Sequence, residues 1–413
     1  MRFALAAEGS RGDVQPMVGL AARLVERGHQ AVVCAPPDLR HLVEERGLEY
    51  RPLGTDVHRF LGESADSLRG GAFAAGQLAK RMFQRILEEQ FEALPRATAG
   101  AEMIIGAGAQ FAGPSVAEIR GIPYRSVHYC PAVLRSAHYP PPILPNQSLP
   151  HWMNRLAWSG FMVFQGQLLR GKINRHRAAL GLGPVSDTYR YLISERPLLA
   201  ADAALAPAPD DVPMEVDQVG YLLPKDESPL PPKLESFLQA GPRPVFLGFG
   251  SMMDSDPAGT THLLLDAVER VGCRAILARG WAGLGEGALP ESVYGAGPLP
   301  HASLFPRVAV VVHHGGAGTT TTVARSGVPQ IIVPHLLDQH YWGHRTYLLG
   351  VSPPPLPRMK LSAARLAELI SASLENELLA GRARELAESL CTGDPLAQAV
   401  DSILASSAVV DRS

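Results

Sequence analysis

The sequence lacks the features that mark several common protein classes. It has 4 cysteines in 413 residues, widely spaced and without a C-x-x-C pair, so we expect neither a disulfide framework nor a zinc site. Its 38 basic and 40 acidic side chains nearly cancel, which gives no indication of a nucleic-acid or anionic-membrane partner. No apolar run approaches the roughly 18 residues that a membrane span requires, so we predict a cytoplasmic protein without stable membrane insertion.

Glycine and proline, by contrast, are abundant. The chain contains 40 glycines and 36 prolines, spread along its length. Such an excess indicates many tight turns between short elements, as in α/β proteins. With 46% hydrophobic residues the chain can form sizeable cores, and its length favours two domains.

The first half of the chain alternates short apolar runs with helical patterns. Pro16 is expected in the first turn of the helix after the first strand, Gly28 ends that helix, and Asp38 can cap the next one. Strands that are apolar throughout favour a parallel sheet covered on both faces. The strands predicted in this half are residues 3–7, 30–35, 48–53, 103–107 and 124–129.

The alternation of strands and helices starts again after residues 222–242, which are rich in proline and charge and have the composition of a linker. Two consecutive α/β halves predict two facing, doubly wound parallel-sheet domains, with ligands in the deep crevice between them. We place these domains at residues 1–221 and 243–390, and we expect a helix at 391–413 to pack back on the first domain. The strands predicted in the second half are residues 245–250, 274–278, 308–312 and 330–333.

An aromatic segment follows a proline-rich stretch in the middle of the chain. Residues 139–150 are proline-rich, and residues 152–170 combine a helical pattern with several aromatic side chains. These side chains either belong to an ordinary core or line a cleft for an apolar substrate. On the second interpretation, Trp152 and Phe161 are candidate acceptor contacts.

The most informative segment is VVVHHGGAGTTTTVA at residues 310–324, where a strand ends in two histidines and a glycine-rich turn leads into a helix. Free amides and the dipole at a helix N-terminus attract phosphate, and His314 can add a charge-assisted bond. Neither G-x-x-x-x-G-K-[ST] nor the spacing of G-x-G-x-x-G is present. We therefore predict a phosphate site at this glycine-rich turn, with His314 beside it.

Further polar residues follow predicted strands and would face the same crevice. Ser251 lies either in an ordinary turn or at a phosphate. Asp338 and Gln339 can hold adjacent sugar hydroxyls, and Asp338 is also suited to cap a helix. In the first turn of the chain, Ser10 is a candidate acceptor contact, and Asp13 is a candidate general base or cap.

Two pairs of histidines raise the question of a metal. These pairs are His313 with His314, and His340 with His344, which are spaced as i and i+4. Neither pair has a third ligand nearby in the sequence, whereas a zinc site in a protein normally uses at least three protein ligands. We therefore expect neither a bound metal nor another cofactor.

The ordered set of motifs resembles that of the family 1 glycosyltransferases of GT-B fold, in particular the bacterial branch with the sterol-glucosyltransferase-like and the antibiotic glycosyltransferases. The resemblance spans essentially the whole chain. It depends on GSRGDVQP (9–16), CAPPD (34–38), FLGFGSM (246–252), HHGGAGTT (313–320), GVPQIIVP (327–334) and DQHYWG (338–343).

This resemblance implies roles for the candidate residues. Asp13 falls where many relatives carry a histidine base and the antibiotic branch carries aspartate. Where plant members carry a stacking tryptophan and a ribose-binding glutamate, this chain has Pro298 and Thr322, which leaves the nucleotide open between UDP and TDP. The remaining roles implied are contacts to the donor diphosphate (Ser251, His314, Gly316, Gly318 and Thr319), to its base (Leu299 and His301) and to the transferred sugar (Asp338 and Gln339).

The implied reaction moves a hexose from a nucleotide diphosphate sugar to a hydroxyl of a hydrophobic natural product, such as a polyketide, macrolide, sterol-like or aromatic compound, with inversion and without a metal. Asp13 would take the proton of that hydroxyl. Because a carboxyl with a pKa of ~3.9 is a weak base, either apolar walls raise the pKa of Asp13 or the acceptor is acidic.

Three alternatives to this reaction stay open. They are an epimerase or hydrolase of nucleotide sugars on the same fold, a C-glycosyltransferase, and a non-catalytic partner of another glycosyltransferase. The expected partners are the two small-molecule substrates, and we expect a monomer or a weak homodimer.

Overall fold

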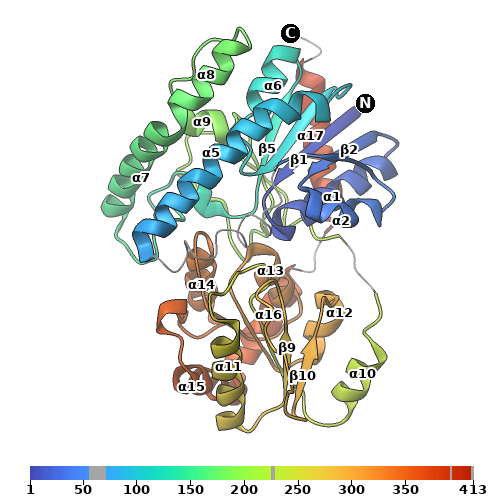
Figure 1. Cartoon of the computed structure of the whole chain (residues 1–413), viewed down its shortest axis with the longest axis vertical. Coiled ribbons are helices and arrows are strands. Elements are labelled where there is room, and N and C mark those ends of the chain that lie inside the picture. The colour runs from blue at the N-terminus through green and yellow to red at the C-terminus, as the bar shows by residue number, and fades with distance from the viewer. Residues whose placement is uncertain (55–70, 225–227, 391–392, 411–413) are drawn as a thin grey trace.

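The computed structural model consists of two α/β domains, each built on one parallel sheet (Figure 1). It describes residues 1–54, 71–224, 228–390 and 393–410. Residues 2–8 and 395–406 both lie on the first domain, so the chain crosses to the second domain and returns. The predicted fold class, two doubly wound domains, is confirmed.

The first domain holds a seven-stranded sheet in the order β3-β2-β1-β4-β5-β6-β7, in which all neighbours are parallel. Its strands are β1 (Arg2–Glu8), β2 (Gln30–Ala35), β3 (Glu49–Pro52), β4 (Met103–Gly108), β5 (Tyr124–His128), β6 (Leu198–Leu199) and β7 (Asp217–Gln218). Its helices are α1 (Arg11–Glu26), α2 (Arg40–Glu44), α5 (Gly71–Ala97), α6 (Gly113–Arg120), α7 (His151–Gln165), α8 (Gly171–Ala179) and α9 (Thr188–Ile193).

The second domain holds a five-stranded sheet in the order β10-β9-β8-β11-β12, again parallel throughout. Its strands are β8 (Val245–Gly248), β9 (Ala275–Ala278), β10 (Val293–Ala296), β11 (Val310–His313) and β12 (Gln330–Ile332). The helices that follow β7 are α10 (Pro232–Gln239), α11 (Pro257–Val271), α12 (His301–Leu304), α13 (Ala317–Arg325), α14 (Gln339–Leu348), α15 (Ala363–Glu375), α16 (Glu377–Leu390) and α17 (Pro395–Val410). None of the helices in the described part of the chain is long and apolar enough to span a bilayer.

Both faces of the first sheet are buried at its central strands, which explains why β1, β2 and β4 are mainly apolar. Successive side chains of a strand point to opposite faces. In β1, Phe3 and Leu5 enter a cluster with α1 and α17, whereas Ala4 and Ala6 enter a second cluster with α5 and α6. The carboxyl end of β1 leads directly into α1, and this turn carries Asp13.

The last helix, α17, packs on the first domain beside α1. Val400 and Ile403 are buried in the core that β1 and α1 share. The buried guanidinium of Arg125 on β5 donates to the backbone and the hydroxyl of Ser402 at 2.9 Å and pairs with Asp217 on β7. The C-terminal helix is thus joined to the sheet by apolar and by charged contacts.

The two domains share an apolar cluster and two polar links. The cluster includes Trp158 from α7 and Trp342 from α14, both fully buried. Arg325 at the end of α13 pairs with Asp202 of the first domain at 2.9 Å. The Arg345 Nε on α14 donates to the Leu205 carbonyl at 2.7 Å. These contacts hold the carboxyl ends of the two sheets toward each other.

Three local expectations differ from the structure. Helix α1 begins at Arg11 after the capping residue Ser10, so Pro16 lies within the helix rather than in its first turn. Asp38 caps no helix, because it lies inside a short 3-10 turn before α2. Helix α10 lies within the segment expected to be linker, and its Leu234 and Leu238 pack into the core of the second domain.

Candidate active site

Asp13 lies at the carboxyl end of the first sheet and forms part of a capping box. Its Oδ2 accepts from the Ser10 amide at 2.8 Å, while the Ser10 Oγ accepts from the Gly12 amide at 3.3 Å. The turn requires glycine nearby, because Gly9 has φ +137° and a Cβ there would lie 2.3 Å from Asp13 Oδ2. Both hydrogen bonds from Ser10 go to Asp13 Oδ2, which leaves Oδ1 for another partner.

The surroundings of Asp13 make it a stronger base than an ordinary aspartate. Burial raises the pKa of Asp13 to about 6; the Ser10 amide opposes this shift, and the negative charge of Asp338 adds to it. This value agrees with the first of the two alternatives, that the walls of the cleft raise the pKa. Because Asp338 belongs to the second domain, these two carboxyl groups, one from each domain, are close enough for their charges to interact.

Two tyrosines that no motif indicated surround this pair of carboxyl groups. Tyr129 donates to the backbone carbonyl of Asp13 at 2.9 Å. The ring of Tyr221 lies 5.8 Å from that of Tyr129, and the charges of both Asp13 and Asp338 raise the pKa of Tyr221. These positions are isolated in the sequence, so only the fold brings them together.

Backbone atoms of the glycine-rich turn lie close to the His314 ring. Gly315 has φ +91°, and a Cβ at Gly316, the residue before α13, would lie 2.5 Å from His314 Nε2. On the other side, a Cβ at Gly250 would lie 2.9 Å from His314 Cε1. The loop that carries Ser251 therefore meets the His314 turn, as a shared phosphate site requires.

The surroundings of His314 favour its neutral form. Burial lowers the pKa of His314 to about 3, and the neighbouring histidines add to the shift. Among the described residues, no group hydrogen-bonds to the buried Nδ1. A neutral imidazole can still donate one hydrogen bond.

His313 holds the glycine-rich turn in position through its two ring nitrogens. Its Nδ1 accepts from the Gly315 amide at 3.1 Å, so its Nε2 carries the proton and donates to Gln330 Oε1 at 2.9 Å. Burial lowers the pKa of His313 to about 4. Both ring nitrogens are thus used within the protein, which leaves His313 unsuited to hold a metal.

The threonines after this turn divide between the site and the helix. Thr319 is partly exposed in the first turn of α13. The Thr322 hydroxyl donates to the Gly318 carbonyl at 2.7 Å. A Cβ at Gly318 would lie 2.8 Å from the Tyr221 hydroxyl, so this glycine permits the first domain to approach α13.

Asp338 and Gln339 are adjacent at the start of α14 but have different environments. Asp338 occupies the N-cap position without making the capping bond, and its Oδ2 accepts from Trp342 Nε1 at 3.2 Å. Burial raises the pKa of Asp338 to about 6. The Gln339 Oε1 accepts from the His335 and Leu336 amides at 2.8 and 3.1 Å, so Gln339 shapes the preceding loop.

The residues expected at the nucleotide base lie beside the second sheet. The His301 ring stacks on Phe305, with 4.5 Å between ring centroids, and Leu299 packs against the same cluster. His301 is close enough to His314 for its charge to lower the pKa of His314. This placement agrees with a site that extends from the phosphates to a base.

The two expected acceptor aromatics have different environments on α7. Trp152 is 65% exposed on α7, and Phe161 packs on the buried Trp158 with 5.6 Å between ring centroids. Trp158 is held by a hydrogen bond from its Nε1 to the Tyr139 carbonyl at 3.0 Å. Most of the aromatic character of this segment thus serves packing or faces solvent.

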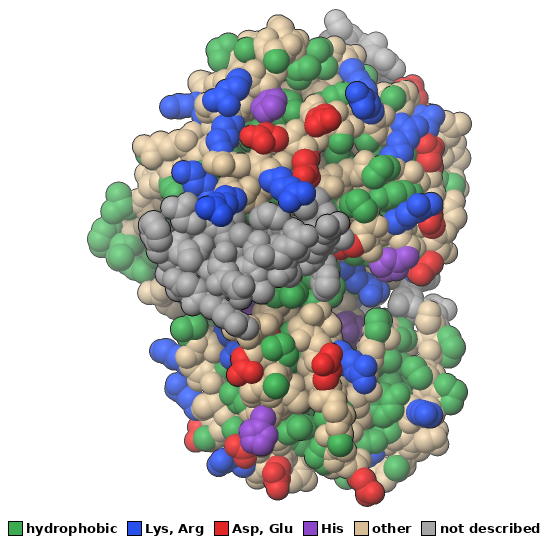
Figure 2. All heavy atoms as spheres, viewed as in Figure 1, with side chains coloured by type: hydrophobic (Ala, Val, Ile, Leu, Met, Phe, Trp, Pro, Cys, Tyr) green, Lys and Arg blue, Asp and Glu red, His purple; other side chains and the backbone are tan. Residues whose placement is uncertain are grey.

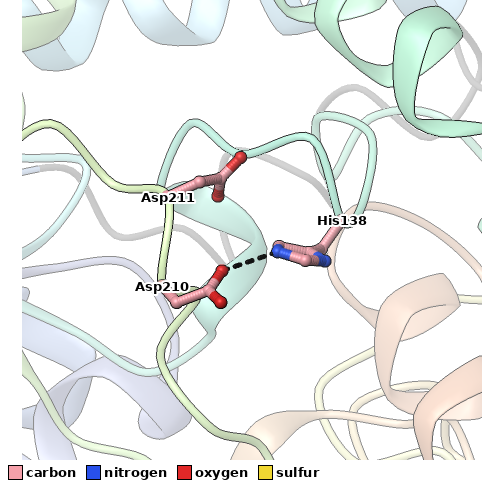
Figure 3. A group of neighbouring side chains, drawn as sticks. All are labelled: His138, Asp210 and Asp211. Atoms are coloured by element: carbon pink, nitrogen blue, oxygen red, sulfur yellow. Dashed lines mark hydrogen bonds and ion pairs between the residues drawn. The ribbon is translucent and has the colours of Figure 1, made fainter.

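One group of three possible metal ligands lies outside this site. Figure 3 shows His138 and Asp210 pointing toward each other, with Nε2 and Oδ1 2.7 Å apart, and Asp211 beside them. All three are exposed, and Asp211 Oδ2 already accepts from the Ala137 amide at 2.7 Å. Neither His340 nor His344 belongs to such a group in the described part of the chain.

Comparison with known families identifies both halves of the chain. The model described as the glycosyltransferase family 28 N-terminal domain matches residues 3–139. A second model, described as the C-terminal domain of the erythromycin biosynthesis protein CIII-like family, matches residues 262–406. The two matches fall on the two α/β domains.

Individual relatives and solved structures agree with these matches. The chain is 38% identical over 382 residues to the vancomycin aglycone glucosyltransferase of Amycolatopsis orientalis, with 90% of each chain covered. It is 33% identical over 418 residues to the sterol 3-beta-glucosyltransferase UGT80B1 of Arabidopsis thaliana, covering 97% of this chain and 67% of that protein. The structure of glycosyltransferase VinC in complex with dTDP superposes with a TM-score of 0.71 at 19% identity and covers 100% of both chains. This chain therefore belongs to the family 1 glycosyltransferases of GT-B fold and is a glycosyltransferase.

Proposed function

We propose that this enzyme transfers a hexose from a UDP- or TDP-sugar to a hydroxyl of a hydrophobic natural product, with inversion at the anomeric carbon and without a metal. The observation that carries the proposal is the pairing of Asp13 from the first domain with Asp338 from the second. Both residues are partly buried, desolvation raises the pKa of each to about 6, and the charge of Asp338 acts on Asp13. A base and a sugar-holding carboxylate on opposite walls suit a reaction between two substrates in the crevice.

Asp13 acts as the general base. Its Oδ1 takes the proton of the acceptor hydroxyl while the hydroxyl oxygen forms a bond to the anomeric carbon. The bond from that carbon to the diphosphate oxygen breaks, and the electron pair leaves with the nucleotide diphosphate. A pKa of about 6 keeps Asp13 mostly ionised at pH 7 and still makes it a better base than an exposed aspartate.

The turn before α13 stabilises the charge that develops on the leaving diphosphate. The free amides at the start of α13 and the helix dipole face this charge, and neutral His314 donates a further hydrogen bond. Fixed donors of this kind take the place of a metal. Asp338 holds a hydroxyl of the transferred sugar, and Gln339 keeps the loop before α14 in position.

The names of the relatives guide the choice of substrates. They include a vancomycin aglycone glucosyltransferase, a dTDP-epi-vancosaminyltransferase at 35% identity, and an O-mycaminosyltylonolide 6-deoxyallosyltransferase at 32% identity. Transfer to an aglycone, and transfer of both a glucosyl and a 6-deoxysugar group, are named in this set. We expect a hydroxylated aglycone as the acceptor of this enzyme, and the aromatic and proline-rich residues 139–170 favour a large, apolar one.

The test is a panel of UDP- and TDP-sugars against hydroxylated hydrophobic acceptors, with products detected by mass spectrometry and the anomeric configuration read by NMR. We expect an O-glycoside of inverted configuration whose formation is unaffected by EDTA and is lost in Asp13→Asn. Asp266→Asn, on the exposed side of α11, is the matched control and should retain activity. Free sugar without acceptor, a C-glycoside, or activity only with a second protein would each contradict the proposal.

A further inference from the structure

Helix α7 presents a row of large apolar side chains to solvent. Trp152 and Leu156 are each 65% exposed, Val163 is 61% exposed and Phe164 is 56% exposed. At 100° per residue, Trp152, Met153, Leu156, Val163 and Phe164 fall within roughly 120° of the helix circumference, so they form one face. We call these five residues the α7 apolar face.

The opposite side of α7 is anchored in the protein by hydrogen bonds, which keeps the α7 apolar face turned to solvent. Asn154 donates to the Ala137 carbonyl at 2.8 Å, and Trp158 donates to the Tyr139 carbonyl at 3.0 Å. Both side chains are fully buried. In Figure 2 hydrophobic side chains protrude at the left edge of the molecule, where α7 lies in Figure 1. The exposed face therefore belongs to a helix that is fixed in place.

The segment that carries the α7 apolar face is basic. Residues 119–186 contain no Asp or Glu, although the whole chain is nearly neutral. Arg155, Arg170 and Arg175 are exposed in this segment, and none of them makes an ion pair within the described residues. The charges of Arg175 and Lys80 add to the burial that lowers the pKa of Lys172, with Glu88 as the opposing acid. The net charge of the chain conceals this local basic surface.

Apolar side chains flanked by cations fit an anionic bilayer better than the other possible occupants. A large exposed apolar face on a soluble domain marks an interaction site. Two copies that paired through α7 would bring like charges together, which opposes association. A helix with Trp, Phe and Leu on one face and Lys or Arg beside them lies at the surface of membranes that carry anionic lipids.

We propose that α7 and α8 form a reversible docking surface for membranes that contain anionic lipids. The α7 apolar face enters the boundary between headgroups and acyl chains, and Arg155, Arg170 and Arg175 bind lipid phosphates. Helix α7, about 22 Å long, would lie in the plane of the membrane. This binding is peripheral and requires no spanning helix, and it does not depend on the proposed reaction.

The experiment is sedimentation with vesicles of phosphatidylcholine alone or mixed with phosphatidylglycerol. We expect binding to the mixed vesicles only, and release at high salt because the attraction between charges is screened. Leu156→Ser/Val163→Ser/Phe164→Ser should weaken binding at least tenfold, and so should Arg155→Gln/Arg170→Gln/Arg175→Gln. Leu378→Ser on α16 is the matched control, because Leu378 is also 65% exposed, and it should bind like the wild type.

A second measurement places α7 at the bilayer. Brominated acyl chains quench tryptophan only at close range, and Trp158 and Trp342 are buried. Quenching should therefore occur in the wild type and be largely lost in Trp152→Phe, and thermal unfolding checks that every variant folds. Equal binding by the apolar triple variant, no binding to the mixed vesicles, or capture of a soluble acidic protein in place of vesicles would each overturn the proposal.

Discussion

The substitution Asp13→Asn separates the function of the buried carboxyl group from its contribution to stability. Asparagine keeps an oxygen that can accept from the Ser10 amide. The hydrogen bond of the capping box is therefore kept, although the negative charge is removed. It removes the proton acceptor of the proposed reaction. Transfer should therefore fall by about 10²–10⁴-fold, the usual contribution of a general base.

The pKa of Asp13 gives the size and the sign of the effect on folding. The pKa rises from 3.8 to about 6 in the folded protein. Each unit corresponds to about 1.4 kcal/mol, so ionised Asp13 disfavours folding by about 3 kcal/mol. Well below pH ~4 the group is protonated in both the folded and unfolded states and this cost is absent. The cost develops between pH ~4 and about 6 and is fully present above that.

Urea unfolding at pH 4, 6 and 8 measures this effect. Asp13→Asn should be more stable than the wild type by about 2–3 kcal/mol at pH 8 and nearly equal to it at pH 4. Ser10→Ala serves as the comparison, because it removes the cap but keeps the carboxyl group. It should cost about 1 kcal/mol at pH 4 and somewhat more at pH 8, where ionised Asp13 also loses the hydrogen bond from the Ser10 hydroxyl. The reasoning is refuted if Asp13→Asn is less stable than the wild type at pH 8, or if its effect does not vary with pH.

Three further predictions concern the same structure. The value of kcat/KM should fall below a pH of about 6 as the base is protonated, and Asp338→Asn, which removes a like charge, should move this inflection to lower pH in a pH–rate profile. Gly316→Ala should raise the Kd for a nucleoside diphosphate at least tenfold by calorimetry, because its Cβ would contact the imidazole, whereas Gly381→Ala, with open space around it, should not. Asp217→Ala should lower the free energy of unfolding by about 3–5 kcal/mol in urea, since it leaves the Arg125 guanidinium buried without its partner; an effect below about 1 kcal/mol would contradict this.

The sequence predicted the fold well because both sheets are parallel and buried. Mainly apolar strands and helices alternate in both halves of the chain, and this pattern suffices for two doubly wound domains. The two-residue strands β6 and β7 could not be predicted, because they have no periodicity and depend on β5 as a template. The expectation for Pro16 is wrong because the capping box of Ser10 and Asp13 starts the helix at Arg11, before the proline.

The candidate site was predictable where it is local and not where it depends on contacts between domains. The turn with His314 and Gly316 is continuous in the sequence, so its glycines and helix start could be identified together. Tyr221 is brought to the site only by the packing of the two domains, and no motif contains it. The exposure of Trp152 could not be predicted either, because aromatic composition does not say which face of a helix a side chain occupies.

The return of α17 to the first domain matters for building hybrid enzymes. Residues such as Val400 and Ile403 complete a core that is otherwise made by residues from the start of the chain. Joining the first half of one enzyme to the second half of another at a single splice point would pair this core with a foreign helix. A chimaera that exchanges the donor specificity therefore needs two splice points, one before α10 and one between α16 and α17, so that each core is inherited whole from one parent.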